Sequence, residues 1–258
     1  MIVYSLFGAE RGYGAVRVRS PDSDIFFILL HHAQKLKSEI FFDTGVGNKR
    51  RLLNISTISK EFGDNFSTAL LGLHAFTGCD TTSAFKGIGK LKPIKILQKS
   101  PEFESSLSEL GESWEVSDRV VKDLEIFTCR LYGSKTTSDI DLLRLNLLKS
   151  KCDYSEKLDS KKCVDFATFP PCQDSLLQHI KRCNYQTAIW KCGGENFPEI
   201  PEALHHGWVL SGDLLEPMWC REEVLPGDLS ELLDENDDSS SDESISELQN
   251  SSDDSYSV

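Results

Sequence analysis

Apolar and polar residues alternate in the early part of the chain at the spacing of β-strands. Residues 15–19, AVRVR, alternate apolar with basic side chains, and two further short strand patterns follow at residues 39–43, EIFFD, and 52–56, LLNIS. Between the first two, the apolar residues 25–36 become amphipathic toward their end, which predicts a helix. Strand, helix and strand in succession predict an α/β layer with a parallel sheet.

Helical spacing dominates the rest of the chain. Ser56 or Thr57 is the predicted cap of a helix that runs through Phe62, and Asp64 is the predicted cap of the next helix. Further helices are predicted at residues 91–99, 100–111, 117–133, 138–150 and 173–190. Residues 206–219 have the pattern of a β-hairpin with a Ser-Gly-Asp turn.

The negative charge of the chain is concentrated at its C-terminal end. The 258 residues carry a formal net charge of −13, but residues 222–258 hold thirteen Asp and Glu and no Lys or Arg. Acids and bases are therefore equal in number, 28 each, in residues 1–221. A basic patch on the folded part is compatible with this balance. Residues 226–258 are rich in Asp, Glu and Ser and poor in apolar residues, which predicts disorder.

The cysteines and the N-terminal segment indicate an intracellular protein, in the nucleus or the cytoplasm, without a membrane partner. The eight cysteines form no C-x-x-C pair, the start of the chain has no basic region of a secretory signal, and the apolar run at residues 25–30 is too short to span a membrane. We expect reduced thiols. For Cys172, Cys183 and Cys192, buried thiols are favoured over a metal site.

A pair of acids follows the first predicted strand. Asp22 and Asp24 lie in the sequence SPDSD, directly after residues 15–19. Ligands of open α/β sheets bind beyond the carboxyl ends of the strands, and paired carboxylates suit Mg²⁺ or Mn²⁺. The alternative is a turn that caps the next helix, because Asp favours helix N-termini. On these residues alone the capping turn is favoured.

A second motif occupies residues 73–95, LHAFTGCDTTSAFKGIGKLKPIK. Asp80 precedes a predicted short helix at residues 81–85, and a glycine turn then leads into the predicted helix at residues 91–99. The turn consists of Gly87, Ile88 and Gly89, and the lysines that follow it are Lys90, Lys92 and Lys95. Exposed turn amides and lysines are typical of a site that binds phosphate without reading bases. The alternative is an ordinary helix–turn–helix with a solvated basic face.

In combination, these motifs resemble the flap endonucleases and the wider PIN-like nuclease family. The similarity extends from residue 15 to about residue 220, and is strongest to animal proteins that carry the motifs SPDTD and LHAFTGCDTTSAF. The resemblance implies that Asp22, Asp24 and Asp80 are catalytic, metal-ligating acids. It also implies that a helix–hairpin–helix around Gly87, Ile88 and Gly89 holds a monovalent cation and grips a DNA or RNA backbone, with Lys90, Lys92 and Lys95 facing phosphates.

The chain departs from the family ahead of its first motif. Members of the family have an N-terminal strand with the first acid and a helix with the acid-rich motif E-A-D-T, whereas Glu10 is the only acid before Asp22 here. We therefore expect a fold without its N-terminal part. The metal site would have three carboxylates, fewer than a site with two ions needs.

Together, these patterns predict an α/β protein with three parts. Residues 1–100 would form a partial, PIN-like parallel sheet with the helix–hairpin–helix, residues 101–225 a helical region that ends in a β-hairpin, and residues 226–258 the disordered acidic tail. The expected function is nucleic-acid binding, with metal-dependent phosphodiester hydrolysis as an inherited activity that this form need not retain. The alternatives are a non-catalytic interaction module of the same fold and an acidic tail that binds a basic protein.

Overall fold

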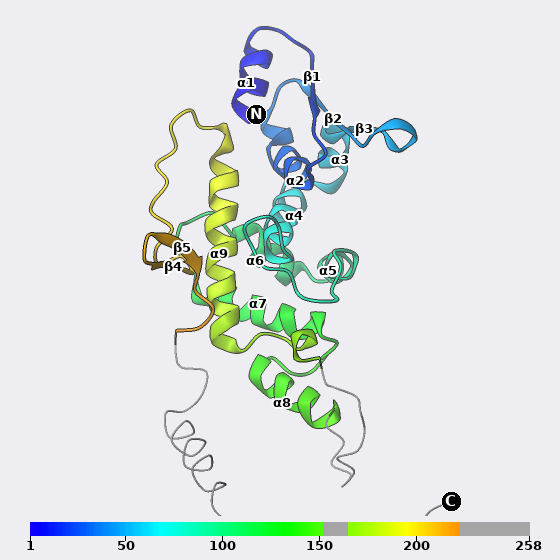
Figure 1. Ribbon diagram of the computed structural model, residues 1–258. Helices are drawn as coiled ribbons and strands as arrows, with labels where there is room; N and C mark the ends of the chain where they lie inside the picture. Colours follow the sequence, from blue (N-terminus) through cyan, green and yellow to red (C-terminus); the bar gives the residue numbers. More distant parts are fainter. Residues whose placement is uncertain (152–164, 222–258) are drawn as a thin grey trace, which may run out of the picture. The chain divides into compact units, whose positions relative to one another are not determined.

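A small sheet and a bundle of helices make up the folded part of the chain in a computed structural model (Figure 1). The structure describes residues 1–151 and 165–221, which belong to one folded unit. The predicted disordered tail at residues 226–258 lies outside the described residues. None of the helices in the described ranges is long and apolar enough to cross a membrane.

The sheet has three strands in the order β1-β2-β3, namely β1 (Ala15–Arg19), β2 (Glu39–Thr44) and β3 (Arg51–Asn54). Strands β1 and β2 are parallel, as predicted, and helix α2 (Ser23–His32) lies between them in the chain. Strand β3 is antiparallel to β2, so the prediction of a parallel sheet is wrong for this strand. Only six residues join β2 to β3, and so short a connection suits a hairpin rather than a crossover.

Asp43 links the three strands through its carboxylate. Its side chain is completely buried on β2 and accepts hydrogen bonds from Arg17 on β1, with Nε at 3.0 Å, and from Arg50 just before β3, with Nε and Nη2 each at 2.9 Å. A buried carboxylate is tolerated because it is paired and hydrogen-bonded. The acid at the end of the predicted strand EIFFD therefore serves the sheet itself.

Helices form most of the remaining structure, and two of them begin with other cap residues than those predicted. The helices are α1 (Ile2–Glu10), α3 (Ile55–Phe62), α4 (Asp64–Phe76), α5 (Leu91–Leu97), α6 (Pro101–Glu109), α7 (Asp118–Leu131), α8 (Ile140–Lys151) and α9 (Gln173–Lys191). Asn54 caps α3 in place of Ser56 or Thr57, and Gly63 rather than Asp64 is the cap of α4. Helix α1 was not predicted.

Residues 81–85 do not form the predicted short helix; they are bends and irregular backbone. The first helix of the predicted helix–hairpin–helix is therefore missing, and the glycine turn joins an irregular loop to α5. The predicted β-hairpin is confirmed as β4 (Trp208–Ser211) and β5 (Leu214–Pro217), which pair antiparallel.

Helix α4 is the central element of the core. It packs against α2, α6 and α9, and its second half, residues 69–76, is buried on all sides (Figure 1). Gly72 permits the close approach of α6, because a Cβ atom at this position would lie 2.2 Å from the carbonyl oxygen of Leu107. Helix α4 thus joins the sheet side of the protein, through α2, to the helical region.

Candidate nucleic-acid interface

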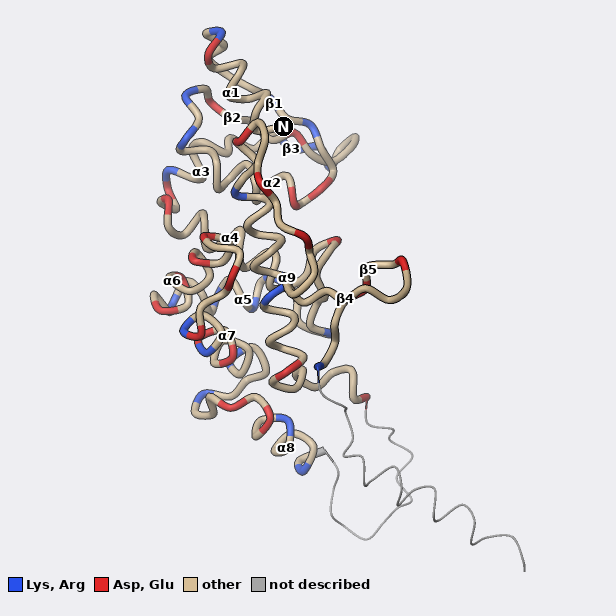
Figure 2. Tube along the Cα trace, turned by 90° about the vertical axis from the view of Figure 1, so that its left-hand side faces the viewer, with Lys and Arg blue, Asp and Glu red and all other residues tan. Residues whose placement is uncertain are grey.

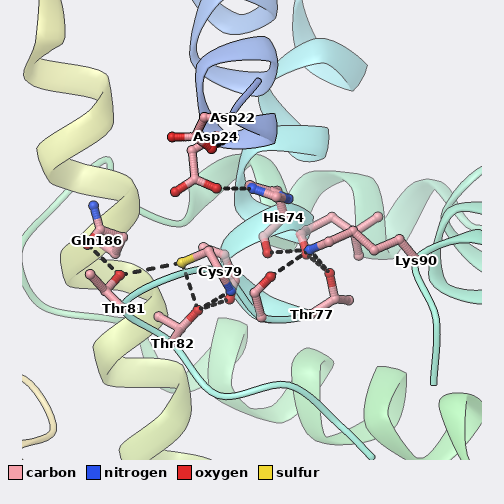
Figure 3. Close-up of polar contacts among 12 residues, drawn as sticks. Asp22, Asp24, His74, Thr77, Cys79, Thr81, Thr82, Lys90 and Gln186 are labelled. Atoms are coloured by element: carbon pink, nitrogen blue, oxygen red, sulfur yellow. Dashed lines mark hydrogen bonds and ion pairs between the residues drawn. The ribbon is translucent and has the colours of Figure 1, made fainter. Parts of the chain in front are cut away.

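The acids of SPDSD lie at the N-terminus of α2, and each already has a partner in the protein. Asp22 is the N-cap, and its carboxylate accepts a hydrogen bond from the backbone N–H of Asp24 at 2.8 Å. The carboxylate of Asp24 accepts a hydrogen bond from Nε2 of His74, on α4, at 2.7 Å (Figure 3). The capping turn considered from the sequence is therefore present.

His74 is buried between aromatic rings. Its ring stacks on Phe27 at a centroid distance of 4.1 Å and lies 5.9 Å from the ring of Trp190, on α9. Burial lowers the pKa of His74, and the bond to Asp24 opposes this shift. A neutral imidazole with its proton on Nε2 can donate to Asp24 across this distance. Its Nδ1 atom then has no protein partner among the described residues. The contact joins α2 to α4.

Lys90 points inward and binds the C-terminal end of α4. Its ammonium group donates to the carbonyl oxygen of Gly78 at 2.7 Å, to that of His74 at 3.1 Å and to Oγ1 of Thr77 at 3.1 Å (Figure 3). The last carbonyls of a helix lack partners within the helix and carry partial negative charge, so a cation is favourable there. Burial lowers the pKa of Lys90. Its predicted contact with phosphate stays a prediction, but its ammonium group is occupied here.

Two further side chains complete this cap of α4. Oγ1 of Thr82 donates to the carbonyl oxygen of Ala75 at 2.6 Å, and Nε2 of His179, on α9, lies 2.9 Å from the carbonyl oxygen of Phe76. Gly78 has a φ of +104°, and a Cβ atom there would lie 2.7 Å from Cβ of Ala84. The loop at residues 77–90 is therefore folded tightly back onto the end of α4.

The three predicted metal ligands are not assembled into a metal site. Asp22 caps α2, Asp24 bonds to His74, and Asp80 is exposed on the loop that follows α4. No group of three or more His, Cys, Asp or Glu side chains in residues 1–151 and 165–221 is arranged to hold a metal ion. Mg²⁺ or Mn²⁺ at these three acids therefore stays a prediction, as does the monovalent cation at Gly87–Gly89.

A basic cleft lies beside α5. Its volume is about 630 Å³, and Lys92, Lys95, Lys99, Arg130 and Lys135 line it together with a single acid, Glu102. The four lysines are exposed, and none of the five basic side chains forms an ion pair within the described part of the chain. Elsewhere, basic and acidic positions are interspersed along the chain (Figure 2).

The sequence indicated only part of this cleft. Lys92 and Lys95 were predicted to face phosphates, and both line it. Lys99 was not singled out, and Arg130 and Lys135 come from the end of α7 and the loop beyond it, more than thirty positions away in the sequence. Local spacing gives no signal for a cluster of this kind, because it arises from the packing of α5 against α7.

Comparison with known protein families, with curated proteins and with solved structures found no match for this chain. The resemblance to PIN-like nucleases therefore stays a prediction.

We predict that replacing Lys90 by Met destabilises the fold. The substitution keeps most of the buried stem but leaves three acceptors at the end of α4 without their donor, so the free energy of unfolding should fall by about 2 kcal/mol. Lys92→Met, in the exposed neighbouring position, is the matched control and should change it by less than about 0.5 kcal/mol. Urea unfolding followed by circular dichroism measures both; equal stabilities of the two variants would contradict the cap.

We also predict that the fold loses stability in mild acid. Burial lowers the pKa of His31 to about 3 and that of His179 to about 4, and it also lowers the pKa values of His32 and His74. The unfolded chain takes up these protons from about pH 6.5 downward, while the folded chain does not. The free energy of unfolding should therefore fall as the pH drops from about 6.5 to about 4.

His179→Gln tests this origin of the acid sensitivity. A glutamine amide can still donate to the carbonyl oxygen of Phe76, but it takes up no proton. The pH dependence of the free energy of unfolding should become shallower by about 1.4 kcal/mol per pH unit, the contribution of one proton. Urea titrations between about pH 7 and about pH 4 measure the slope; an unchanged slope would show that His179 does not titrate as described.

Proposed function

We propose that this protein binds the sugar–phosphate backbone of nucleic acid in the basic cleft beside α5. The observation that carries the proposal is the gathering of five basic side chains around one concave surface that has a single acid. Lysines without ion-pair partners can contact phosphates and displace the counterions condensed on the nucleic acid. The affinity then depends on the salt concentration and not on the base sequence. Residues 1–221 carry equal numbers of acidic and basic residues, so the positive charge at the cleft is a local excess and does not reflect a basic composition of this part of the chain.

The cleft is shaped for a backbone rather than for a small anion. Its basic side chains come from two segments of the chain. Lys92 and Lys95 lie on α5 and Lys99 just beyond it, whereas Arg130 lies in the last turn of α7 and Lys135 in the loop that follows. Apolar atoms of Leu91, Ile96 and Phe103 form part of its wall. Charges spread along a cleft suit a ligand with repeated phosphates, and apolar walls suit contact with sugars.

Binding without hydrolysis is the activity that we propose. Two of the three acids that the resemblance assigns to catalysis have structural partners, because Asp22 caps α2 and Asp24 is bonded to His74, whereas Asp80 is exposed. This agrees with the alternative of a non-catalytic module. The PIN-like origin of the fold and the inherited phosphodiesterase activity remain proposals that a cleavage assay addresses.

Charge reversal in the cleft tests the proposal. The full chain should bind duplex and single-stranded oligonucleotides, and Lys95→Glu/Lys99→Glu should weaken binding by about tenfold or more at about 0.1 M salt. The plot of log affinity against log salt concentration should become shallower by about two units, because two phosphate contacts are lost. Fluorescence anisotropy measures both quantities.

Lys37→Glu/Lys60→Glu is the matched control, because it changes the net charge equally at two exposed lysines that do not line the cleft. This variant should bind nearly as well as the unmodified protein. Equal losses in the two variants would show that only overall charge matters and would contradict the cleft. If the protein cleaves the oligonucleotides in the presence of Mg²⁺ or Mn²⁺, and Asp24→Asn abolishes this cleavage, the claim that the protein binds without hydrolysis is overturned.

A further inference from the structure

Two cysteines that are distant in the sequence meet at the N-terminus of α9. Cys172 is the N-cap residue of this helix, and Cys220 follows the β4–β5 hairpin. Their Sγ atoms lie 3.8 Å apart, although 48 positions separate them in the chain. The hydroxyl of Ser175 is 3.1 Å from Sγ of Cys172 and 2.9 Å from Sγ of Cys220. Both cysteines are partly exposed, so a small solute can reach them.

The backbone on both sides of Cys220 is fixed to α9 by contacts that do not involve sulfur. The guanidinium of Arg182, which is buried on α9, donates to the carbonyl oxygen of Gly207 at 2.8 Å and to that of Met218 at 2.6 Å. The backbone N–H of Arg221 donates to the carboxylate of Asp174 in the first turn of α9. The two thiols are therefore held together by the fold (Figure 1 shows the hairpin beside α9).

We propose that Cys172 and Cys220 are a peroxide-sensitive pair that forms a reversible intramolecular disulfide. The sulfur atoms are already in van der Waals contact, and a disulfide bond of about 2.05 Å requires them to approach by less than about 2 Å. Side-chain rotation can supply much of this movement, while the contacts of Arg182 and Asp174 keep the two backbone segments in place.

The surroundings make Cys172 the attacking thiol. Burial raises the pKa of Cys172, but its contacts with Ser175 and Cys220 and the charge of Arg144 outweigh this effect, so the pKa lies below its ordinary value. For Cys220, the Ser175 hydrogen bond lowers the pKa, but burial and the neighbouring Cys172 and Asp174 raise it overall. The N-terminus of a 19-residue helix also favours a thiolate at Cys172.

The reaction consumes one molecule of hydrogen peroxide. The Cys172 thiolate attacks one peroxide oxygen, the O–O bond breaks, and hydroxide leaves and takes up a proton, which gives a sulfenic acid and water. The Cys220 sulfur then attacks Sγ of Cys172, the S–S bond forms, and the S–O bond breaks with loss of a second water. Two thiols thus give up two electrons and two protons, and the peroxide is reduced to two waters. A reducing dithiol reverses the disulfide.

The disulfide would tie the hairpin covalently to the start of α9. It would close a long loop between residues 172 and 220, and a cross-link of this kind restricts the unfolded chain. The oxidised protein should therefore melt at a higher temperature than the reduced protein. Reduction by a dithiol should return the melting temperature to its initial value.

Peptide mapping of the full chain after treatment with hydrogen peroxide tests the proposal. After the remaining thiols have been alkylated, the main cross-linked peptide should join Cys172 to Cys220, with two hydrogens fewer than its free parts, and it should disappear after reduction. A different main pair, or oxidation of Cys172 to sulfinic acid without a cross-link, would overturn the proposal.

Three controls separate the effect of the fold from general thiol reactivity. Cys220→Ser should abolish the cross-link and leave a sulfenic acid at Cys172 that a dimedone probe captures. Cys192→Ser, at another partly exposed cysteine, should form the cross-link at the rate of the unmodified protein. In urea, the preference for the pair should be lost; a cross-link that dominates equally in urea would show that the fold does not create it, and would contradict the proposal.

Discussion

The ammonium group of Lys90 at the C-terminal end of α4 is the interaction on which the arrangement of the candidate interface depends. It neutralises a helix end that would otherwise present carbonyl oxygens to a buried environment, and it draws the loop at residues 77–90 back onto α4. Helix α5 begins directly after Lys90. The cap therefore fixes where α5 starts, and with it the positions on α5 of Lys92 and Lys95, which line the cleft.

The same region gives structural partners to two of the three acids that the resemblance assigns to catalysis. Asp24 and His74 join α2 to α4 through one hydrogen bond, in a setting closed by the rings of Phe27 and Trp190. Oδ1 of Asp24 accepts this hydrogen bond, so the carboxylate already has a structural role. Asp24, one of the acids that first suggested a metal site, thus helps to hold the sheet side to the helical region, while the positive charge proposed to meet a phosphate backbone lies around α5. The proposed binding surface and the contact of Asp24 with His74 therefore involve different residues.

Much of the fold could be predicted from the sequence, because its local patterns are clear. Alternation identified β1 and β2, helical spacing identified the larger helices, and the hairpin at β4 and β5 followed from its turn. Helix α1 was not predicted because it is apolar around much of its circumference and no side chain caps it. The inward position of Lys90 depends on tertiary contacts, whereas the antiparallel direction of β3 fits the short connection of six residues that joins it to β2. Of the cleft, Lys92 and Lys95 were predictable, whereas Arg130 and Lys135 were not, since they meet α5 only through the packing of distant helices.

Amide hydrogen exchange of the full chain, with and without a duplex oligonucleotide, locates the surface of the protein that the sugar–phosphate backbone contacts. If the cleft beside α5 binds the duplex, exchange in residues 91–99 and 130–135 should slow on its addition at low salt, and exchange at residues 22–24 should not change. Protection at the N-terminus of α2 and around Asp80, with none at α5, would contradict binding in the cleft and would favour a binding site at the acids.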